Sequence, residues 1–257
     1  MGMERRTVVK GAAWSLPVIA AAVAAPAAAA SDGGEAACVP TQMHLDWARD
    51  YRRTGATAGS AAVGDGGTPI ALTVTQAGIG ANTRTGNQAR TENLNLAVSS
   101  FAVGGTASAG LAIHQSPISN SRKAGSTSSA ARIAENSQTI RFDFSEPVDR
   151  LSFLITDIDA AAYDYFDRVV IESGAAFTAS SGGGSIVAGS GTTTDPLRAG
   201  RIEPVPETSG RANATVSFLE PVTSFSLTYQ NVESRSNSRI DGDQAIFLSA
   251  LSFTTTC

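Results

Sequence analysis

The sequence predicts an all-β protein: a single β-sandwich, jelly-roll-like, with long loops rich in glycine, serine and threonine. Apolar and polar residues alternate with a period of two in several short runs, most clearly in Thr139–Phe144. Turn-forming residues separate the runs, as in the polar segments Pro117–Gln138 and Ser180–Thr194. No stretch after the first 30 residues keeps a 3.6-residue apolar period, so we expect little helix. A parallel β-helix is the alternative, although the chain lacks the short regular repeat that it requires.

We expect about ten short strands joined by polar loops, a number typical of a sandwich. In Thr139–Phe144 the residues Ile140, Phe142 and Phe144 share one face, and Leu151, Phe153 and Ile155 repeat this pattern in the next strand. In chain order the expected strands are Thr41–Trp47 (strand or turn), Ile70–Gln76, Leu94–Ser100, Gly110–Gln115, Thr139–Phe144, Leu151–Ile155, Arg168–Glu172, Ala214–Leu219, Ser224–Tyr229 and Ala245–Phe253.

Residues 1–30 have the charged, apolar and small-residue order of a cleavable signal peptide. Arg5, Arg6 and Lys10 precede a weakly apolar stretch, and the small-residue run Ala27–Ala30 follows it, so we place cleavage after Ala30. The apolar stretch is too short and too rich in glycine and alanine for a stable membrane span. An uncleaved N-terminal anchor helix is the alternative.

The order Arg-Arg-x-apolar-apolar-Lys at residues 5–10 resembles the twin-arginine signal, whose pathway carries folded proteins across the bacterial membrane. An ordinary secretion route is the alternative, because Glu4 precedes the arginines and Val8 and Val9 stand where Phe-Leu is common. Lysine occurs only at Lys10 and Lys123, whereas arginine is plentiful. Together with the leader, this bias indicates a secreted or cell-surface protein of a high-GC Gram-positive bacterium.

The rest of the chain, residues 31–257, is long enough for one large domain with its own core. The chain has 19 basic and 23 acidic residues. The leader removes three basic residues and one acidic residue, which leaves 16 against 22, a net charge of about −6. No basic stripe is available for binding nucleic acid. Because no second apolar span follows the leader, we expect no membrane span after it is removed.

The chain has two cysteines, Cys38 near the expected new N-terminus and Cys257 at the last position. In an exported protein such a pair predicts a disulfide between the two ends of the domain. On the chain-entropy model, closing so long a loop stabilises the fold by about 5 kcal/mol. Two free thiols or a pair of metal ligands are the alternatives.

One internal repeat is present. Phe144–Phe153 aligns with Phe218–Leu227, and each copy reads as a strand, a Glu-Pro-Val corner and a second strand. Proline suits the corner because it fixes φ and has no amide hydrogen to donate to a ladder. The alignment continues into the oxygen-rich tripeptides Asp157–Asp159 and Asn231–Glu233. We interpret the repeat as a duplicated supersecondary unit; chance similarity is the alternative, because glutamate and proline are common at corners.

Both copies are followed by clustered oxygen ligands, which predicts calcium binding. Clustered carboxylates repel one another unless a cation or solvent relieves the repulsion, and calcium takes six to eight oxygen ligands. Solvated caps that keep strand ends from pairing with other molecules are the alternative. The first candidate site is Asp157, Asp159, Asp164 and Asp167, and the second is Asn231, Glu233, Asp241 and Asp243.

Tyr163, Tyr165 and Phe166 add an aromatic cluster to the first acidic loop. Aromatic rings beside carboxylates are typical of a sugar-binding face, because the rings cover C–H faces while the acids bind hydroxyls. The alternative is that one or two of these rings fill the end of the sandwich. We expect Trp47, the one tryptophan after the leader, to lie in the core.

The sequence predicts no enzyme. After the leader there are two histidines, His44 and His114, and neither lies in a nucleophile or metal motif. Asp157 and Asp159 alternate on one strand, whereas a glycosidase places its two carboxylates on opposite sides of the substrate. We therefore interpret them as a cation site and not as an acid and base pair.

Three segments carry a resemblance to known proteins: Ile140–Val148, Leu151–Phe153 and Thr156–Asp159. Over residues 90–256 the chain resembles a sandwich domain of secreted bacterial surface and adhesin-like proteins. This resemblance implies binding or display and not catalysis. We expect a secreted, non-catalytic module that binds a glycan or a cell-surface protein through the Asp157–Asp167 loop, with calcium as a stabilising cofactor. A secreted hydrolase acting on polysaccharide is the alternative.

Overall fold

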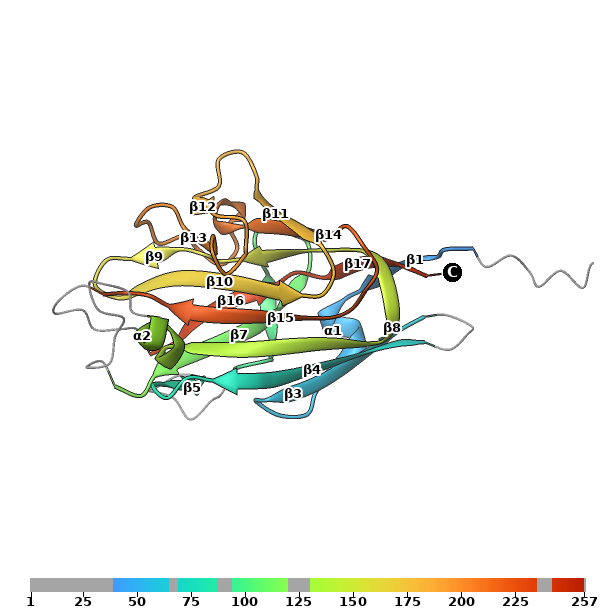
Figure 1. The fold of residues 1–257 in the computed structure, drawn as a ribbon, viewed down its shortest axis with the longest axis horizontal. Coiled ribbons are helices and arrows are strands. Elements are labelled where there is room, and N and C mark those ends of the chain that lie inside the picture. The colour runs from blue at the N-terminus through green and yellow to red at the C-terminus, as the bar shows by residue number, and fades with distance from the viewer. Residues whose placement is uncertain (1–38, 65–68, 87–93, 120–129, 235–241, 257) are drawn as a thin grey trace, which may run out of the picture. The chain divides into compact units, whose positions relative to one another are not determined.

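The computed structural model describes residues 39–64, 69–86, 94–119, 130–234 and 242–256. Within these ranges the chain is almost entirely β, and every strand pairing is antiparallel, so the predicted all-β sandwich is confirmed (Figure 1). The signal residues Arg5, Arg6, Lys10 and Ala30, and the cysteines Cys38 and Cys257, lie outside the described residues. The predictions made for them remain predictions.

The helices are short: α1 (Trp47–Asp50), α2 (Ala130–Glu135) and the 3-10 helix η2 (Gly210–Ala212). Among the described residues, none of the helices has the length and apolar character needed to cross a bilayer. The strands are β1 (Gln42–Leu45), β2 (Tyr51–Arg53), β3 (Ala58–Val63), β4 (Ile70–Ile79), β5 (Thr83–Thr85), β6 (Val98–Ala102), β7 (Ala109–Pro117), β8 (Ser137–Thr156), β9 (Ala160–Ala161), β10 (Tyr165–Ser173), β11 (Phe177–Ser181), β12 (Val187–Ala188), β13 (Leu197–Ala199), β14 (Ala214–Phe218), β15 (Val222–Asn231), β16 (Gln244–Leu248) and β17 (Leu251–Thr255).

Strand β8 belongs to both layers of the sandwich. Its first half pairs with β4 and β15, and its second half pairs with β14, β16 and β17. Between the halves the chain turns at the Glu-Pro-Val corner, which ends at Val148, and Arg150 has a left-handed φ of 52°. Figure 1 shows β8 running along one layer, turning at one end and returning along the other. The two expected strands Thr139–Phe144 and Leu151–Ile155 are therefore one bent strand.

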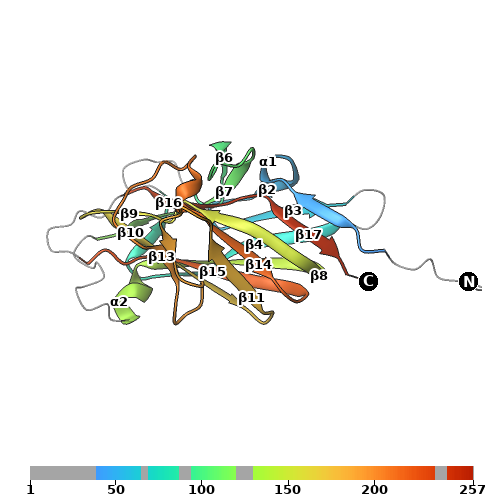
Figure 2. The ribbon, with the colours of Figure 1, turned by 90° about the horizontal axis from the view of Figure 1, so that it is seen from above.

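Each layer can be followed through its pairings. The first layer has the order β2, β3, β4, the first half of β8, β15, β10, β13 and β12. In the second, β14 and β11 lie on one side of the second half of β8, while β16 and β17 lie on the other (Figure 2). Strand β7 then pairs with β16, β5 and β6, and β1 pairs with β17.

The two Glu-Pro-Val corners lie side by side, because Val148 is paired with Val222. The first strand of each copy pairs with the second strand of the other: the first half of β8 with β15, and the second half with β14. This exchange is the pattern of two similar units related by a local two-fold axis. The register thus agrees with the duplication that the sequence predicts.

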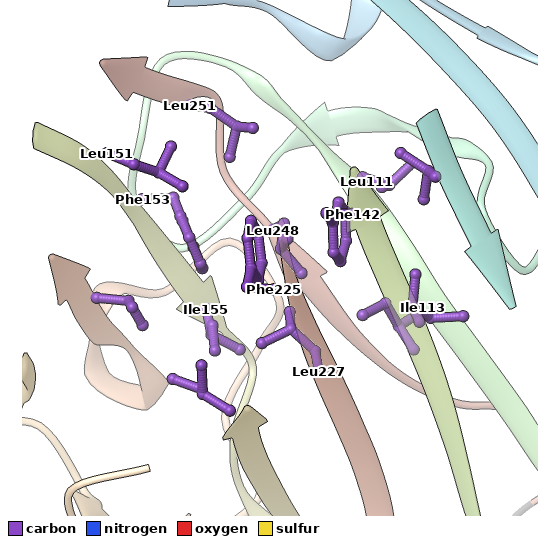
Figure 3. Packing of buried hydrophobic residues seen from close by; sticks show 14 of the residues in the cluster. Leu111, Ile113, Phe142, Leu151, Phe153, Ile155, Phe225, Leu227, Leu248 and Leu251 are labelled. Carbon is purple, nitrogen blue, oxygen red and sulfur yellow. The ribbon is translucent and has the colours of Figure 1, made fainter. Parts of the chain in front are cut away.

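The core lies between the layers and is rich in phenylalanine. Phe225 on β15 stacks on Phe142 at 4.6 Å between ring centroids and reaches across to Phe153 at 5.2 Å and Phe218 at 5.5 Å. We call these four residues the phenylalanine cluster. Figure 3 shows Phe142, Phe153 and Phe225 among the surrounding leucines and isoleucines. Trp47 is fully buried, as expected, and its indole N–H donates to the Ser249 carbonyl oxygen at 2.8 Å.

The structure differs from the expected strands in several places. Ala245–Phe253 is divided into β16 and β17 because the Ser249 carbonyl oxygen accepts from the Trp47 indole, and the Ser249 hydroxyl takes its place as the acceptor for the Leu154 amide. Residues 94–97 precede β6 and are not a strand. The polar segment Pro117–Gln138 contains α2, which no apolar period indicated. Strands β2, β3, β5, β9, β11, β12 and β13 were not expected.

Candidate functional site

The two oxygen-rich tripeptides meet at the end of the sandwich opposite the corners. Strand β10 pairs with β15 so that Asp167 lies opposite Asn231. The Asp167 amide donates to the Asp159 carbonyl oxygen at 3.0 Å, which holds the end of β8 beside the start of β10. The Tyr163 amide donates to Glu233 Oε2 at 3.2 Å. The tips of both copies therefore lie together.

Burial distinguishes these acids from solvated loop caps. The side chains of Asp159, Asp167 and Glu233 are 2%, 1% and 1% exposed. Asn231 and Glu233 bind backbone amides: Asn231 Oδ1 accepts from Phe166 and Glu233, and Glu233 accepts from Tyr163. The second tripeptide thus secures the loop between β9 and β10.

A cavity of about 430 Å³ opens between these strand ends. Five carboxyl groups line it, together with two tyrosines, and none of its described lining residues is a lysine or arginine. The lining residues are Asp157, Asp159, Tyr165, Asp167, Pro204, Val205, Pro206, Glu207, Tyr229, Asp243, Gln244, Ala245 and Phe247. We call this space the acidic cavity.

Hydrogen bonds fix two of the three inner aspartates. Asp159 accepts from the Val205 amide and from the Tyr165 hydroxyl. Asp167 Oδ1 accepts from the Tyr229 hydroxyl at 2.6 Å, and its Oδ2 accepts from the Asp159 amide at 3.3 Å. These donors hold the carboxyl groups at the wall of the cavity.

Asp157 is held differently. It has a left-handed φ of 68°, as does Tyr163 with 69°, so the chain turns sharply where it leaves β8. The Oδ1 atom of Asp157 is buried and has no hydrogen-bond partner. An unpartnered buried acceptor is unfavourable, and it favours a donor brought by a ligand.

Burial also shifts the titration of these acids. It raises the pKa of Asp157 to about 8, and the nearby charges of Asp159 and Glu207 contribute to the rise. It raises the pKa of Asp159 to about 6, although the bonds from Val205 and Tyr165 oppose the shift. Burial raises the pKa of Asp167 well above its ordinary value, even though Tyr229 donates to it. A cation entering the cavity would favour the ionised forms.

The Pro204–Glu207 segment lines the cavity and is anchored by Gly104. The Gly104 amide donates to the Glu207 carbonyl oxygen at 2.7 Å, and Asn213 Nδ2 donates to the Gly104 oxygen at 2.8 Å. Gly104 has a φ of +57°, and a Cβ atom there would collide with the Thr156 side chain. Glycine is therefore required where the backbone supports Glu207.

An apolar groove of about 350 Å³ adjoins the acidic cavity. The two spaces share Glu207, Asp243, Ala245 and Phe247. Phe101, which is 36% exposed, packs edge to face on Phe247, with 5.6 Å between ring centroids and 72° between ring planes. Leu94, Ala97, Val98, Ser99, Ser100, Phe101, Ala112 and His114 line the remainder.

His114 contributes little charge to this groove. Burial lowers its pKa, while a backbone hydrogen bond with Asp243 and the Asp243 charge oppose the shift. The imidazole is therefore largely neutral at neutral pH. His44, the other histidine of the domain, lies on β1 and lines neither space.

The structure separates the residues that the sequence grouped. Asp157, Asp159, Asp167 and Asp243 line the cavity, whereas Asp164 does not, and Asp241 lies outside the described residues. Of the three predicted ligand-binding aromatics, Tyr165 lines the cavity and Phe166 does not. Tyr163 is 56% exposed at the loop tip and also lies outside the lining.

Sequence reasoning missed several residues of the site. Tyr229 was assigned only to a strand, Glu207 lies in a proline-rich segment without a motif, and Phe101 and Phe247 are single aromatics far apart in the chain. Only the repeat carried a signal, because it aligned Asp157–Asp159 with Asn231–Glu233 at matching strand ends.

In the described part of the chain, no three acidic, histidine or cysteine side chains are grouped so that they could hold a metal ion. The strongest chemical feature of the site is a roomy acidic cavity beside an aromatic groove. No protein-family model matches the chain, and comparisons with curated proteins and with solved structures find no match.

Proposed function

We propose that the chain is a secreted, non-catalytic binding module that takes a glycan into the acidic cavity. The observation that carries this proposal is a cavity of about 430 Å³, lined by carboxyl and tyrosine hydroxyl groups and adjoining an aromatic groove. Carboxylates and hydroxyls bind sugar hydroxyls, while aromatic rings cover the C–H faces of the sugar. The proposal of secretion rests on the leader.

The position of the cavity supports binding by a preformed site. Most of its walls come from the ends of β8, β10, β15 and β16, all of which extend into the core, and the Pro204–Glu207 segment adds the remainder. Side chains on such elements keep their positions better than side chains on loops, which reduces the entropy lost on binding.

A glycan array tests the proposal. We expect the purified chain to bind a defined set of glycans, and Glu207→Gln and Asp243→Asn to weaken that binding. Both residues are exposed at the cavity, so the substitutions leave the core unchanged. Glu172→Gln is the matched control, because Glu172 is an exposed acid on β10 outside the cavity. Absence of binding to every glycan would refute the proposal.

A polysaccharide hydrolase is the second candidate, and one observation favours it. Burial raises the pKa of Asp157 to about 8, and a carboxyl group that is protonated near neutral pH can act as a general acid. The assay is release of reducing sugar from polysaccharides that the array identifies. Turnover that Asp157→Asn abolishes would establish the hydrolase, and binding without turnover would exclude it for those substrates.

A further inference from the structure

The acidic cavity and the apolar groove form one composite surface. Glu207, Asp243, Ala245 and Phe247 line both spaces, so a ligand longer than one sugar ring contacts both. Each space alone has the size of a small-molecule site. The ligand must therefore satisfy carboxyl groups at one end and aromatic rings at the other.

We propose that this surface selects a glycan with free ammonium groups, that is, a 2-amino-2-deoxy sugar chain, and this inference rests on the proposed function. The ammonium group enters the acidic cavity. The C–H face of a neighbouring ring packs on Phe101, which Phe247 supports from below the groove surface.

The charge of the site is the first argument. Asp157, Asp159, Asp167, Glu207 and Asp243 bring five carboxyl groups to one cavity, and the described linings of both spaces contain no lysine or arginine. An ammonium group favours the ionised forms of the carboxyl groups whose pKa burial raises, and it donates charge-assisted hydrogen bonds to them, whereas a neutral sugar does not favour the ionised forms.

Two unpartnered polar atoms supply an independent argument. Asp157 Oδ1 is a buried acceptor without a donor. Gln244 is 5% exposed and lines the cavity, and its Nε2 is a buried donor without an acceptor. An amino sugar provides both partners, since its ammonium group donates to the carboxylate and its hydroxyl oxygens accept from the amide.

The dimensions favour an organic cation over a bare metal ion. No three acidic, histidine or cysteine side chains of the described chain are grouped so that they could hold a metal ion, and the cavity volume of about 430 Å³ is typical of a site for an organic ligand. The groove favours a sugar over a simple amine, because Phe101, which is 36% exposed, offers an aromatic surface to a pyranose ring.

The experiment compares four probes by isothermal titration calorimetry. These are a β-1,4-linked glucosamine hexamer, its fully N-acetylated form, the neutral cellohexaose, and hexalysine. We expect the glucosamine hexamer to bind at least about tenfold more tightly than each of the others, and its affinity to fall as salt is added.

Variants then locate the binding. Glu207→Gln, Asp243→Asn and Phe101→Ala should each weaken binding of the glucosamine hexamer by about three- to tenfold, while Glu172→Gln leaves it unchanged. All four positions are at least partly exposed, and circular dichroism verifies that the variants fold.

The outcomes separate the two proposals. Equal or tighter binding of the N-acetylated or neutral hexamer overturns the ammonium selectivity while the glycan-binding function stands. Equal binding of hexalysine overturns the inference, because it shows that charge alone is recognised. If none of the three hexamers binds, the ammonium selectivity fails, and the glycan array alone decides whether the glycan-binding function stands.

Discussion

Asp157→Asn should make the protein more stable at alkaline pH. Asparagine has nearly the same shape as aspartate and tolerates the left-handed φ of 68° at this position. It carries no ionisable group, so the variant removes one buried acid and leaves the backbone in place. The trend with pH then reports whether burial penalises the charged carboxylate.

The magnitude follows from the pKa. The pKa of Asp157 rises from an ordinary 3.8 to about 8, and each unit corresponds to 1.36 kcal/mol. An interval of about four pKa units limits the loss in free energy of unfolding caused by ionisation of Asp157 to about 5 to 6 kcal/mol. Because Asp157 shares its charge repulsion with Asp159 and Asp167, we expect a difference of about 2 to 4 kcal/mol between the proteins.

The sign is fixed by proton binding. The folded chain binds the Asp157 proton more tightly than the unfolded chain, so the free energy of unfolding falls as the pH rises from about 4 to about 8. The fall then ends, because the carboxyl group is ionised in both states. The variant lacks this decrease, so it should resemble the wild type at pH 4 and exceed it at pH 8.5.

The assay is urea denaturation at pH 4, 6.5 and 8.5, followed by the fluorescence of the fully buried Trp47. Glu172→Gln, at an exposed position on β10, should show the same trend with pH as the wild type. Parallel curves for the wild type and Asp157→Asn, or a less stable variant at pH 8.5, would refute the reasoning.

Three further predictions concern the core and the cavity. Phe225→Ala, at the centre of the phenylalanine cluster, should lower the free energy of unfolding by about 3 to 5 kcal/mol in urea denaturation, and a loss below about 1 kcal/mol would contradict the packing. Tyr229→Phe removes the hydroxyl that donates to Asp167 and should lower the free energy of unfolding by about 1 to 3 kcal/mol. Its control is Tyr51→Phe, which removes a bond to a neutral carbonyl oxygen and should have the smaller effect. Calcium binding in the Asp157–Asp167 loop predicts a melting temperature that rises in millimolar calcium and falls in EDTA; identical values would exclude it.

The parts of the fold that the sequence predicts are those recorded in local patterns. Ile140, Phe142 and Phe144 alternate with polar residues, so their strand and its buried face follow from a period of two. Strand β3 (Ala58–Val63) was missed because its residues are small and resemble a loop. The division at Ser249 depends on a hydrogen bond to Leu154, far away in the chain.

The same reason limits prediction of the site. Asp157 and Asp159 could be found because oxygen-rich residues recur at matching places in a repeat. Glu207 and Phe101 reach the site only through tertiary contacts, such as the bond between the Gly104 amide and the Glu207 carbonyl oxygen. Burial of the acids could not be predicted either, because clustered aspartates most often mark a hydrated loop.

The shared strand β8 determines the order in which the protein can fold during synthesis. Its first half pairs with β4, which the ribosome has already made, and with the later β15, whereas every partner of its second half, β14, β16 and β17, is made after β8 itself. Until then the backbone donors and acceptors of that half remain open to other chains, and such edges promote aggregation. The first layer can therefore be completed once β15 has emerged, whereas the second must wait for β16 and β17, and its open edge needs protection from premature association until then.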